Sequence, residues 1–185
     1  NKHMYHLTDT SGSWVRTLLE DIGTNTGGTS LDIAIDPTTD QPGISYFNMY
    51  QTSLKYTYYT GSTWSTPFED NGADYGRYNS IVYDSVGNVH ISHEQNTADD
   101  LMYTSDKTGS WLTTPVDTAS SVGLYTAIAV DSNDDLHIAY RYNSGSDTRH
   151  ATVQGYKTGS EARTDVTGAT CSISPALPFG LILNQ

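Results

Sequence analysis

The chain of 185 residues has one cysteine, few basic residues and no long hydrophobic run. A single cysteine excludes an intrachain disulfide, and we expect Cys171 to be a small buried apolar side chain. Without about 18 consecutive apolar residues, no membrane-spanning segment is expected. Only 9 lysines and arginines stand against 21 aspartates and glutamates, which gives a formal net charge of −12. Nucleic acids and anionic membranes are therefore not expected as partners, because both require a basic surface.

Runs of alanine, leucine, glutamate and lysine that favour helices are also absent. The apolar fraction is modest at 36%, but 14 tyrosines, 3 tryptophans and 3 phenylalanines supply bulk for a core. Frequent Gly, Ser, Thr, Asn and Asp are typical of short strands joined by tight turns. The composition thus predicts an all-β protein with one core. No signal peptide is recognised at the N-terminus; the compartment stays open, although the acidic composition would suit extracellular surroundings.

Three landmarks recur in a fixed order along the chain, which is the signature of a repeat. The first is a turn phrase that ends in tryptophan, at Trp14, Trp64 and Trp111, with spacings of 50 and 47 residues. The second is a short apolar run that ends in aspartate, at 30–36, 78–84 and 125–131. The third is an alternating run, at 43–48, 90–95 and 137–142. Each landmark has the pattern of a strand followed by turn residues.

Four short antiparallel strands per 47 residues match the size of one β-propeller blade. We expect complete blades at about 29–70, 76–117 and 123–167, with a half blade at each end, 1–25 and 170–185. The N-terminal half supplies the third and fourth strands and the C-terminal half the first and second. Their pairing predicts one domain, 1–185, a four-bladed ring closed within a monomer. The alternative is an eight-bladed ring closed by strand exchange in a homodimer.

The turn phrase resembles the Asp-box of sialidase-like and BNR-repeat propellers, Ser/Thr-x-Asp-x-Gly-x-Thr-Trp, which lies between the third and fourth strands of a blade. The matching residues are Thr57, Gly61, Thr63 and Trp64; Thr104, Asp106 and Trp111; and Asp9, Gly12 and Trp14. Tyr59 replaces the aspartate of one copy, and Gly109 stands one position late in another. The resemblance implies a folding device, in which the aspartate stabilises the turn and the tryptophan packs in the core.

Sialidase activity does not follow from this resemblance. None of the five arginines can be matched to the arginine triad with which sialidases hold the substrate carboxylate. Some polysaccharide lyases and lectins resemble the chain at the same repeat level, and a lyase would need a tyrosine or histidine base beside an arginine. The catalytic candidates, if the protein is an enzyme, are therefore His93, Tyr140 and Arg141.

Two repeated positions are expected to face a central channel. One precedes the first strand and holds Ser30, Tyr78 and Tyr125; the other lies in the second strand and holds Tyr46, His93 and Tyr140. Aromatic rings there would stack on a sugar, and packing between blades is the alternative. The neighbouring Arg–Tyr pairs favour an acidic sugar or another carboxylate. The candidate ligand-binding residues are Arg77, Tyr78, His93, Glu94, Tyr125, Tyr140, Arg141 and Tyr142. His90 and His137 recur at one position, which predicts a packing role.

Metal binding has one candidate, the alternating oxygen donors Asp131, Asn133 and Asp135, which would suit Ca²⁺. Because this stretch aligns with the plain turn at 84–88, a hairpin turn is the expected structure and no cofactor is predicted. The sequence favours a non-catalytic propeller that recognises a carbohydrate or protein ligand through loops on one face. The alternatives are a glycan-active enzyme, either a polysaccharide lyase or glycosidase-like, and a self-assembling structural module.

Overall fold

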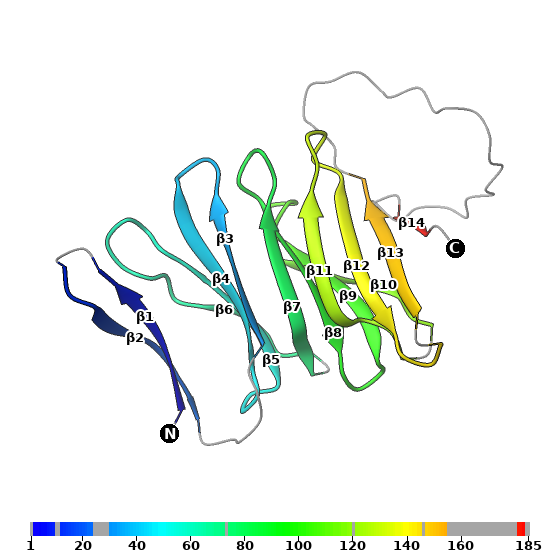
Figure 1. Cartoon of the computed structure of the whole chain (residues 1–185), viewed down its shortest axis with the longest axis horizontal. Coiled ribbons are helices and arrows are strands. Elements are labelled where there is room, and N and C mark those ends of the chain that lie inside the picture. Colours follow the sequence, from blue (N-terminus) through cyan, green and yellow to red (C-terminus); the bar gives the residue numbers. More distant parts are fainter. Residues whose placement is uncertain are drawn as a thin grey trace.

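The computed structural model describes residues 2–9, 12–23, 30–72, 74–119, 121–145, 147–154 and 181–183. Within these ranges the chain forms fourteen strands and no helix, so the all-β prediction is confirmed. The strands form one two-stranded and three four-stranded sheets, and every pairing is antiparallel (Figure 1). It follows that this described part of the chain holds no helix able to span a membrane.

Each sheet is an up-and-down meander built from strands that follow one another in the chain. The N-terminal hairpin comprises β1 (Lys2–Thr8) and β2 (Val15–Gly23). The first sheet comprises β3 (Leu31–Asp36), β4 (Gln41–Asn48), β5 (Ser53–Tyr58) and β6 (Phe68–Asp70). The second sheet comprises β7 (Tyr75–Tyr83), β8 (Val89–Gln95), β9 (Asp100–Ser105) and β10 (Leu112–Asp117). The third sheet comprises β11 (Leu124–Val130), β12 (Leu136–Tyr142), β13 (Asp147–Val153) and β14 (Leu181–Leu183).

The repeat units of the sequence correspond to these sheets, but the C-terminal segment does not pair as expected. Residues 181–183 form β14, which pairs with β13 as the outer strand of the third sheet. They do not pair with the N-terminal hairpin, so the closure predicted for 170–185 is wrong for this part of the segment. The physical reason is the free edge of β13, whose backbone groups beside the buried Ala151 and Val153 require partners. The rest of 155–185 lies outside the described residues, including the fourth strand expected before 167.

The sheets stand in a row, with the hairpin at one end and the third sheet at the other (Figure 1). The first strand of the second sheet, β7, contacts both β3 and β11. One buried apolar cluster fills the junction between the first and second sheets and includes Leu54, Ile81 and Ile91. A second cluster fills the next junction and includes Leu101, Ile128 and Ile138. The core therefore lies between sheets, because both faces of the second sheet are covered.

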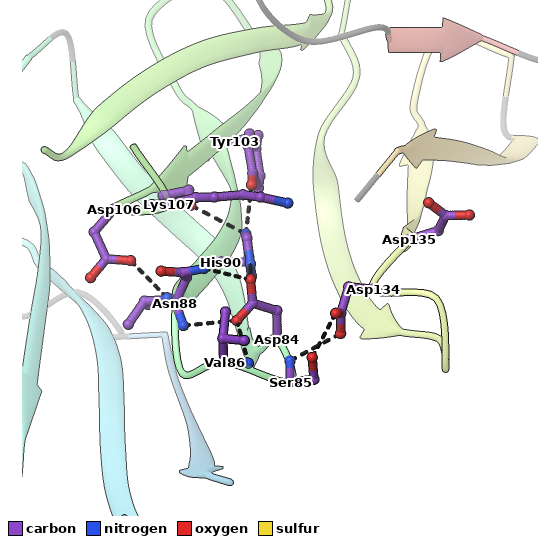
Figure 2. Close-up of polar contacts among 12 residues, drawn as sticks. Asp84, Ser85, Val86, Asn88, His90, Tyr103, Asp106, Lys107, Asp134 and Asp135 are labelled. Atoms are coloured by element: carbon purple, nitrogen blue, oxygen red, sulfur yellow. Dashed lines mark hydrogen bonds and ion pairs between the residues drawn. The ribbon is translucent and has the colours of Figure 1, made fainter. Parts of the chain in front are cut away.

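The repeated aspartate at the end of each first strand caps the turn that follows. Asp84 accepts hydrogen bonds from the backbone amides of Val86 (3.1 Å) and Asn88 (2.9 Å) and from the Asn88 side chain (2.7 Å). His90 Nε2 lies 3.3 Å from the same carboxylate, and the Tyr103 hydroxyl lies 2.6 Å from His90 Nδ1 (Figure 2). The histidine that recurs in the sequence thus pairs with the recurring aspartate, as its predicted packing role requires.

Two of the three tryptophans of the turn phrase pack on the preceding unit. Trp111 stacks on Phe68 with ring centroids 4.1 Å apart and contacts Tyr56 at 5.3 Å. Trp64 contacts His6 of the N-terminal hairpin at 5.3 Å. Trp14, in the hairpin itself, is 71% exposed. The tryptophan is therefore a contact between successive sheets.

Candidate ligand-binding sites

His93, the favoured catalytic histidine, is fully buried in the junction between the first and second sheets. Its Nδ1 accepts a hydrogen bond from the Gly76 backbone amide (3.2 Å), and its Nε2 lies 2.8 Å from the Thr104 hydroxyl. Burial lowers the pKa of His93 to about 4, so the ring is neutral at physiological pH. Both nitrogens are thus engaged within the second sheet. The Thr104 hydroxyl lies 2.7 Å from that of Thr113, which donates to Asp70 of the first sheet, so His93 is linked to the neighbouring sheet.

The equivalent tyrosines in the other sheets are engaged in the same way. The Tyr140 hydroxyl donates to Asp117 (2.7 Å), which also accepts a hydrogen bond from Arg149 (3.0 Å). The Tyr46 hydroxyl donates to Glu20 (2.6 Å) in the equivalent position. Lys55 forms an ion pair with the same glutamate and occupies the position of Arg149. Acid, tyrosine and cation therefore recur as one device that joins successive sheets.

The proposed catalytic trio is not assembled. His93 and Tyr140 lie in different sheets and each is engaged at its own junction, whereas Arg141 is exposed. Tyr142 packs beneath the Arg149 guanidinium, at 3.9 Å from its ring centroid. The second-strand position holds Tyr46, His93 and Tyr140 in the three sheets. These different residues are therefore alternative ways of linking one sheet to the sheet before it.

Four of the candidate residues do cluster, and we call them the tyrosine platform: Arg77, Tyr78, Glu94 and Tyr125. The two tyrosine rings lie 4.5 Å apart. Both tyrosines have left-handed backbone conformations, with φ of 49° and 51°. A bulky residue rarely adopts this conformation, and such strain gathers at binding and catalytic sites.

The same strained segment is built twice, since the residues two and four positions before each tyrosine also have positive φ. They are Asp74 and Gly76 before Tyr78, and Ser121 and Gly123 before Tyr125. The ladders between the first and second strands are irregular at these places. The repeated bulge orients the Tyr78 and Tyr125 side chains toward each other. Bulges often reorient side chains in this way next to functional sites.

Charged groups complete the platform. Arg77 pairs with Glu94 across the β7–β8 ladder, and its guanidinium lies 3.5 Å from Asp74 and 5.3 Å from the Phe47 ring centroid. Glu94 is buried. Burial and the nearby charge of Asp99 raise the pKa of Glu94 to about 7, against the opposing effect of Arg77. A carboxyl group with this pKa can exchange a proton near neutral pH.

Replacing Glu94 with glutamine is expected to change the pH dependence of stability. A raised folded-state pKa means that the folded protein holds the proton more tightly, so ionisation of Glu94 opposes folding as the pH rises from 4.5 to about 7. The glutamine variant should therefore lose less stability than the wild type over this range, by up to about 1.4 kcal/mol per pH unit. Urea unfolding between pH 4.5 and 8 measures this. Parallel curves for the two proteins would refute the assignment.

A second site, not foreseen from the sequence, lies between the first and second sheets. It is a cleft of about 410 Å³, which we call the aromatic cleft. Its aromatic lining consists of Tyr56, Tyr58, Tyr59, Phe68, Tyr83 and Trp111. Its polar lining includes Asp36, Thr39, Gln41 and Asp106. Concave sites with aromatic walls and a few polar groups are the usual form of small-molecule sites.

The aromatic cleft lies where the first sheet departs from the repeat. Gly43 occupies the position of His90 and His137, and a Cβ atom there would lie 2.0 Å from the Tyr83 hydroxyl. Tyr83 reaches into that space and its hydroxyl lies 2.7 Å from the hydroxyl of Tyr56. Tyr59 lines the cleft in the position of the Asp-box aspartate. These departures were visible in the sequence, but only the structure shows that they surround one space.

The charge of the aromatic cleft is negative or neutral. Its described lining contains two carboxyl groups and no lysine, arginine or histidine. Asp106 accepts a hydrogen bond from the Val89 backbone amide (2.8 Å), and burial raises its pKa. Asp36 accepts hydrogen bonds from the amide and hydroxyl of Thr38 (2.8 and 2.7 Å). Such a lining offers acceptors to hydroxyl groups and repels anions.

The candidate calcium ligands form a turn. Asp131 accepts hydrogen bonds from the backbone amides of Asn133 (2.7 Å) and Asp135 (3.0 Å). The arrangement reproduces that of Asp84. Within the described ranges, no group of three or more His, Cys, Asp and Glu side chains is arranged to hold a metal ion.

Comparison with known proteins identifies no relative of this chain. No protein-family model matches the chain, and no curated protein matches it significantly. Function must therefore be argued from the tyrosine platform and the aromatic cleft themselves.

Proposed function

We propose that this protein is a non-catalytic binding module that recognises a carbohydrate in the aromatic cleft. The observation that carries the proposal is a cavity of about 410 Å³ with six aromatic lining residues. The apolar face of a sugar ring stacks on aromatic side chains, and its hydroxyl groups require hydrogen-bond acceptors at the rim. Asp36, Gln41 and Asp106 supply acceptor oxygens.

The charge of the lining favours a neutral sugar. Two carboxyl groups without a cation disfavour uronic or sialic acids, because a second anion would be repelled. Asp106 also keeps a role in the fold, since one of its oxygens binds the Val89 amide. Its other oxygen is the acceptor that we assign to a sugar hydroxyl.

We further propose that the sheets are blades of a propeller related to the Asp-box proteins. Support comes from the same meander, capped turn and tryptophan contact in successive units. A ring would bury the free edge of β1 and the exposed side chains of β3, namely Leu31, Ile33 and Ile35. Closure within one chain and closure between two chains are both compatible with this proposal.

Replacing Tyr58 with alanine is expected to weaken binding of a neutral oligosaccharide by about tenfold, the effect of losing one stacking contact worth about 1.4 kcal/mol. Tyr58 is suitable because it lines the cleft yet is 47% exposed, so the fold should tolerate the change. Glycan-array screening identifies the ligand, and isothermal titration calorimetry then measures its affinity.

Tyr50→Ala is the matched control, since Tyr50 is 68% exposed and is not part of the cleft. It should bind as the wild type does. The proposal fails if both variants bind equally well, or if no neutral glycan binds at all.

The tyrosine platform supports a second candidate function, an enzyme acting on acidic glycans. The specific observation is Glu94, a buried acid with a pKa of about 7, opposite Arg77 and beside two strained tyrosines. Arg77 would hold a substrate carboxylate and Glu94 would exchange the proton. The Glu94→Gln variant described above distinguishes the functions, because it should abolish turnover of acidic polysaccharides and leave binding in the aromatic cleft unchanged.

A further inference from the structure

Successive units are joined by a contact between two different surfaces, a tryptophan of one unit and a third-strand aromatic residue of the unit before it. One end of the row carries the first kind of surface and the other end carries the second. At two of the three described junctions the tryptophan of one unit packs on the third strand of the unit before it. Trp111 contacts Tyr56, and Trp64 contacts His6. Tyr56 and His6 occupy the same repeat position, 50 residues apart. The next two members of this series are Tyr103 and His150, 47 and 94 residues after Tyr56.

The N-terminal hairpin presents the tryptophan half of this contact on an exposed surface. Trp14 is 71% exposed. On the two strands, Tyr5 lies opposite Leu18 and Leu7 lies opposite Arg16, so these four side chains share one face. Tyr5, Leu7 and Leu18 are all exposed, and the Arg16 guanidinium covers the Tyr5 ring at 4.4 Å. The opposite face of the hairpin carries His6 and Glu20, which contact the first sheet.

The third sheet presents the other half. His150 is exposed and stacks on His137, with ring centroids 5.3 Å apart and an interplanar angle of 8°. This pair reproduces the stack of Tyr103 on His90 in the second sheet. It offers a flat aromatic surface in the repeat position where His6 and Tyr56 each receive a tryptophan.

The outer face of the third sheet also differs from the internal junctions in polarity. At the internal junctions a serine of the second strand bonds a polar residue of the next first strand; the pairs are Ser45 with Asn79 (2.7 Å) and Ser92 with Thr126 (2.9 Å). On the outer face of the third sheet the serine position holds Ala139. The end face of the third sheet therefore lacks the polar group that the internal faces carry at this position.

We propose that two copies of this chain associate head to tail, with Trp14 of one copy packed on the His137–His150 pair of the other. A second copy is the occupant because it carries the complementary surface in the repeat geometry already used twice within the chain. The hairpin and the third sheet, which carry the two surfaces, lie at opposite ends of the row (Figure 1). The proposed contact is the one that would close a ring between two chains. It does not depend on glycan binding.

Sedimentation equilibrium of the full chain tests the proposal. We expect concentration-dependent association of the wild type and an increase in its dissociation constant of at least about tenfold for Trp14→Ser, because exposed tryptophans in apolar contacts dominate interface energies. Tyr50→Ser, which removes an equally exposed aromatic residue away from both end faces, should associate as the wild type does.

A mixing experiment tests the direction of the contact. Trp14→Ser retains an intact histidine surface and His150→Ala retains an intact tryptophan surface. Each variant alone should be mainly monomeric, whereas an equimolar mixture should regain one junction and form heterodimers. A monomeric wild type, association unaffected by Trp14→Ser, or a mixture no heavier than the separate variants would each overturn the proposal.

Discussion

Replacing Asp84 with alanine is expected to lower the free energy of unfolding by about 3–5 kcal/mol, because each buried donor left without its acceptor costs about 1–3 kcal/mol. Asp84 is almost fully buried and accepts hydrogen bonds from two backbone amides and the Asn88 side chain. The change would leave these donors and the buried His90 without their acceptor (Figure 2). Urea unfolding at pH 7 measures the loss.

The matched control is Asp131→Ala. Asp131 caps the equivalent turn with the same backbone hydrogen bonds, but it is exposed to solvent, which can replace the lost acceptor. Its loss should be much smaller. Similar losses for the two variants would show that burial does not decide the strength of this turn.

The effect of Asp84→Ala should also depend on pH. Burial alone would raise the pKa of Asp84, but the contacts with His90 and Asn88 outweigh it and hold the pKa well below its ordinary value of 3.8. A lowered folded-state pKa contributes stability that is present above pH 3.8 and lost as the pH falls below it. The difference between wild type and variant should therefore shrink between pH 4 and pH 2.

Gly76→Ala is expected to destabilise the protein by about 4 kcal/mol, the sum of a strained backbone and an overpacked contact. Gly76 has φ of +108°, and an added Cβ would lie 2.7 Å from the Leu54 Cα atom. The obstacle is backbone, so it cannot rotate away. Thermal and urea unfolding measure the loss, and the change should also displace Tyr78 from the tyrosine platform.

Gly109→Ala separates the two causes. Gly109 has φ of +80° with nothing within 4 Å of an added Cβ, so alanine there introduces backbone strain alone. We expect a cost of about 1–2 kcal/mol. If the Gly109 and Gly76 variants lose equal stability, close packing against Leu54 is not the reason for the glycine.

The repeat provides an internal standard for recognising sites in this protein. Where the same position makes the same contact in different units, as Tyr46 and Tyr140 do with Glu20 and Asp117, the fold explains the residue. Where one unit departs from the repeat and the new residue lines a cavity, as Tyr59 does in the aromatic cleft, the repeat does not explain the residue. By this criterion His93 and Tyr140 are structural residues, and the aromatic cleft is the better candidate for a binding site.

Much of the architecture could be predicted from local pattern. Alternation of apolar residues and turn chemistry act over a few residues, so strands such as β8 and β12 and the turns after Asp84 and Asp131 were predicted near their observed places. The period of the landmarks also predicted four strands per unit, which the first and second sheets have. The pairing of 181–183 was missed, because which free edge a short apolar segment joins is not a local property.

The sequence by itself determined the class of fold, the repeat and the capped turns, because these depend on neighbours along the chain. Only the tertiary structure decided which residues share a space. It buried His93 and Tyr140 in junctions, placed the Tyr78 and Tyr125 ring centroids 4.5 Å apart, and surrounded one cleft with residues from four turns and six strands. Such contacts join residues about 47 apart, and their geometry depends on how sheets stack, which no single repeat specifies.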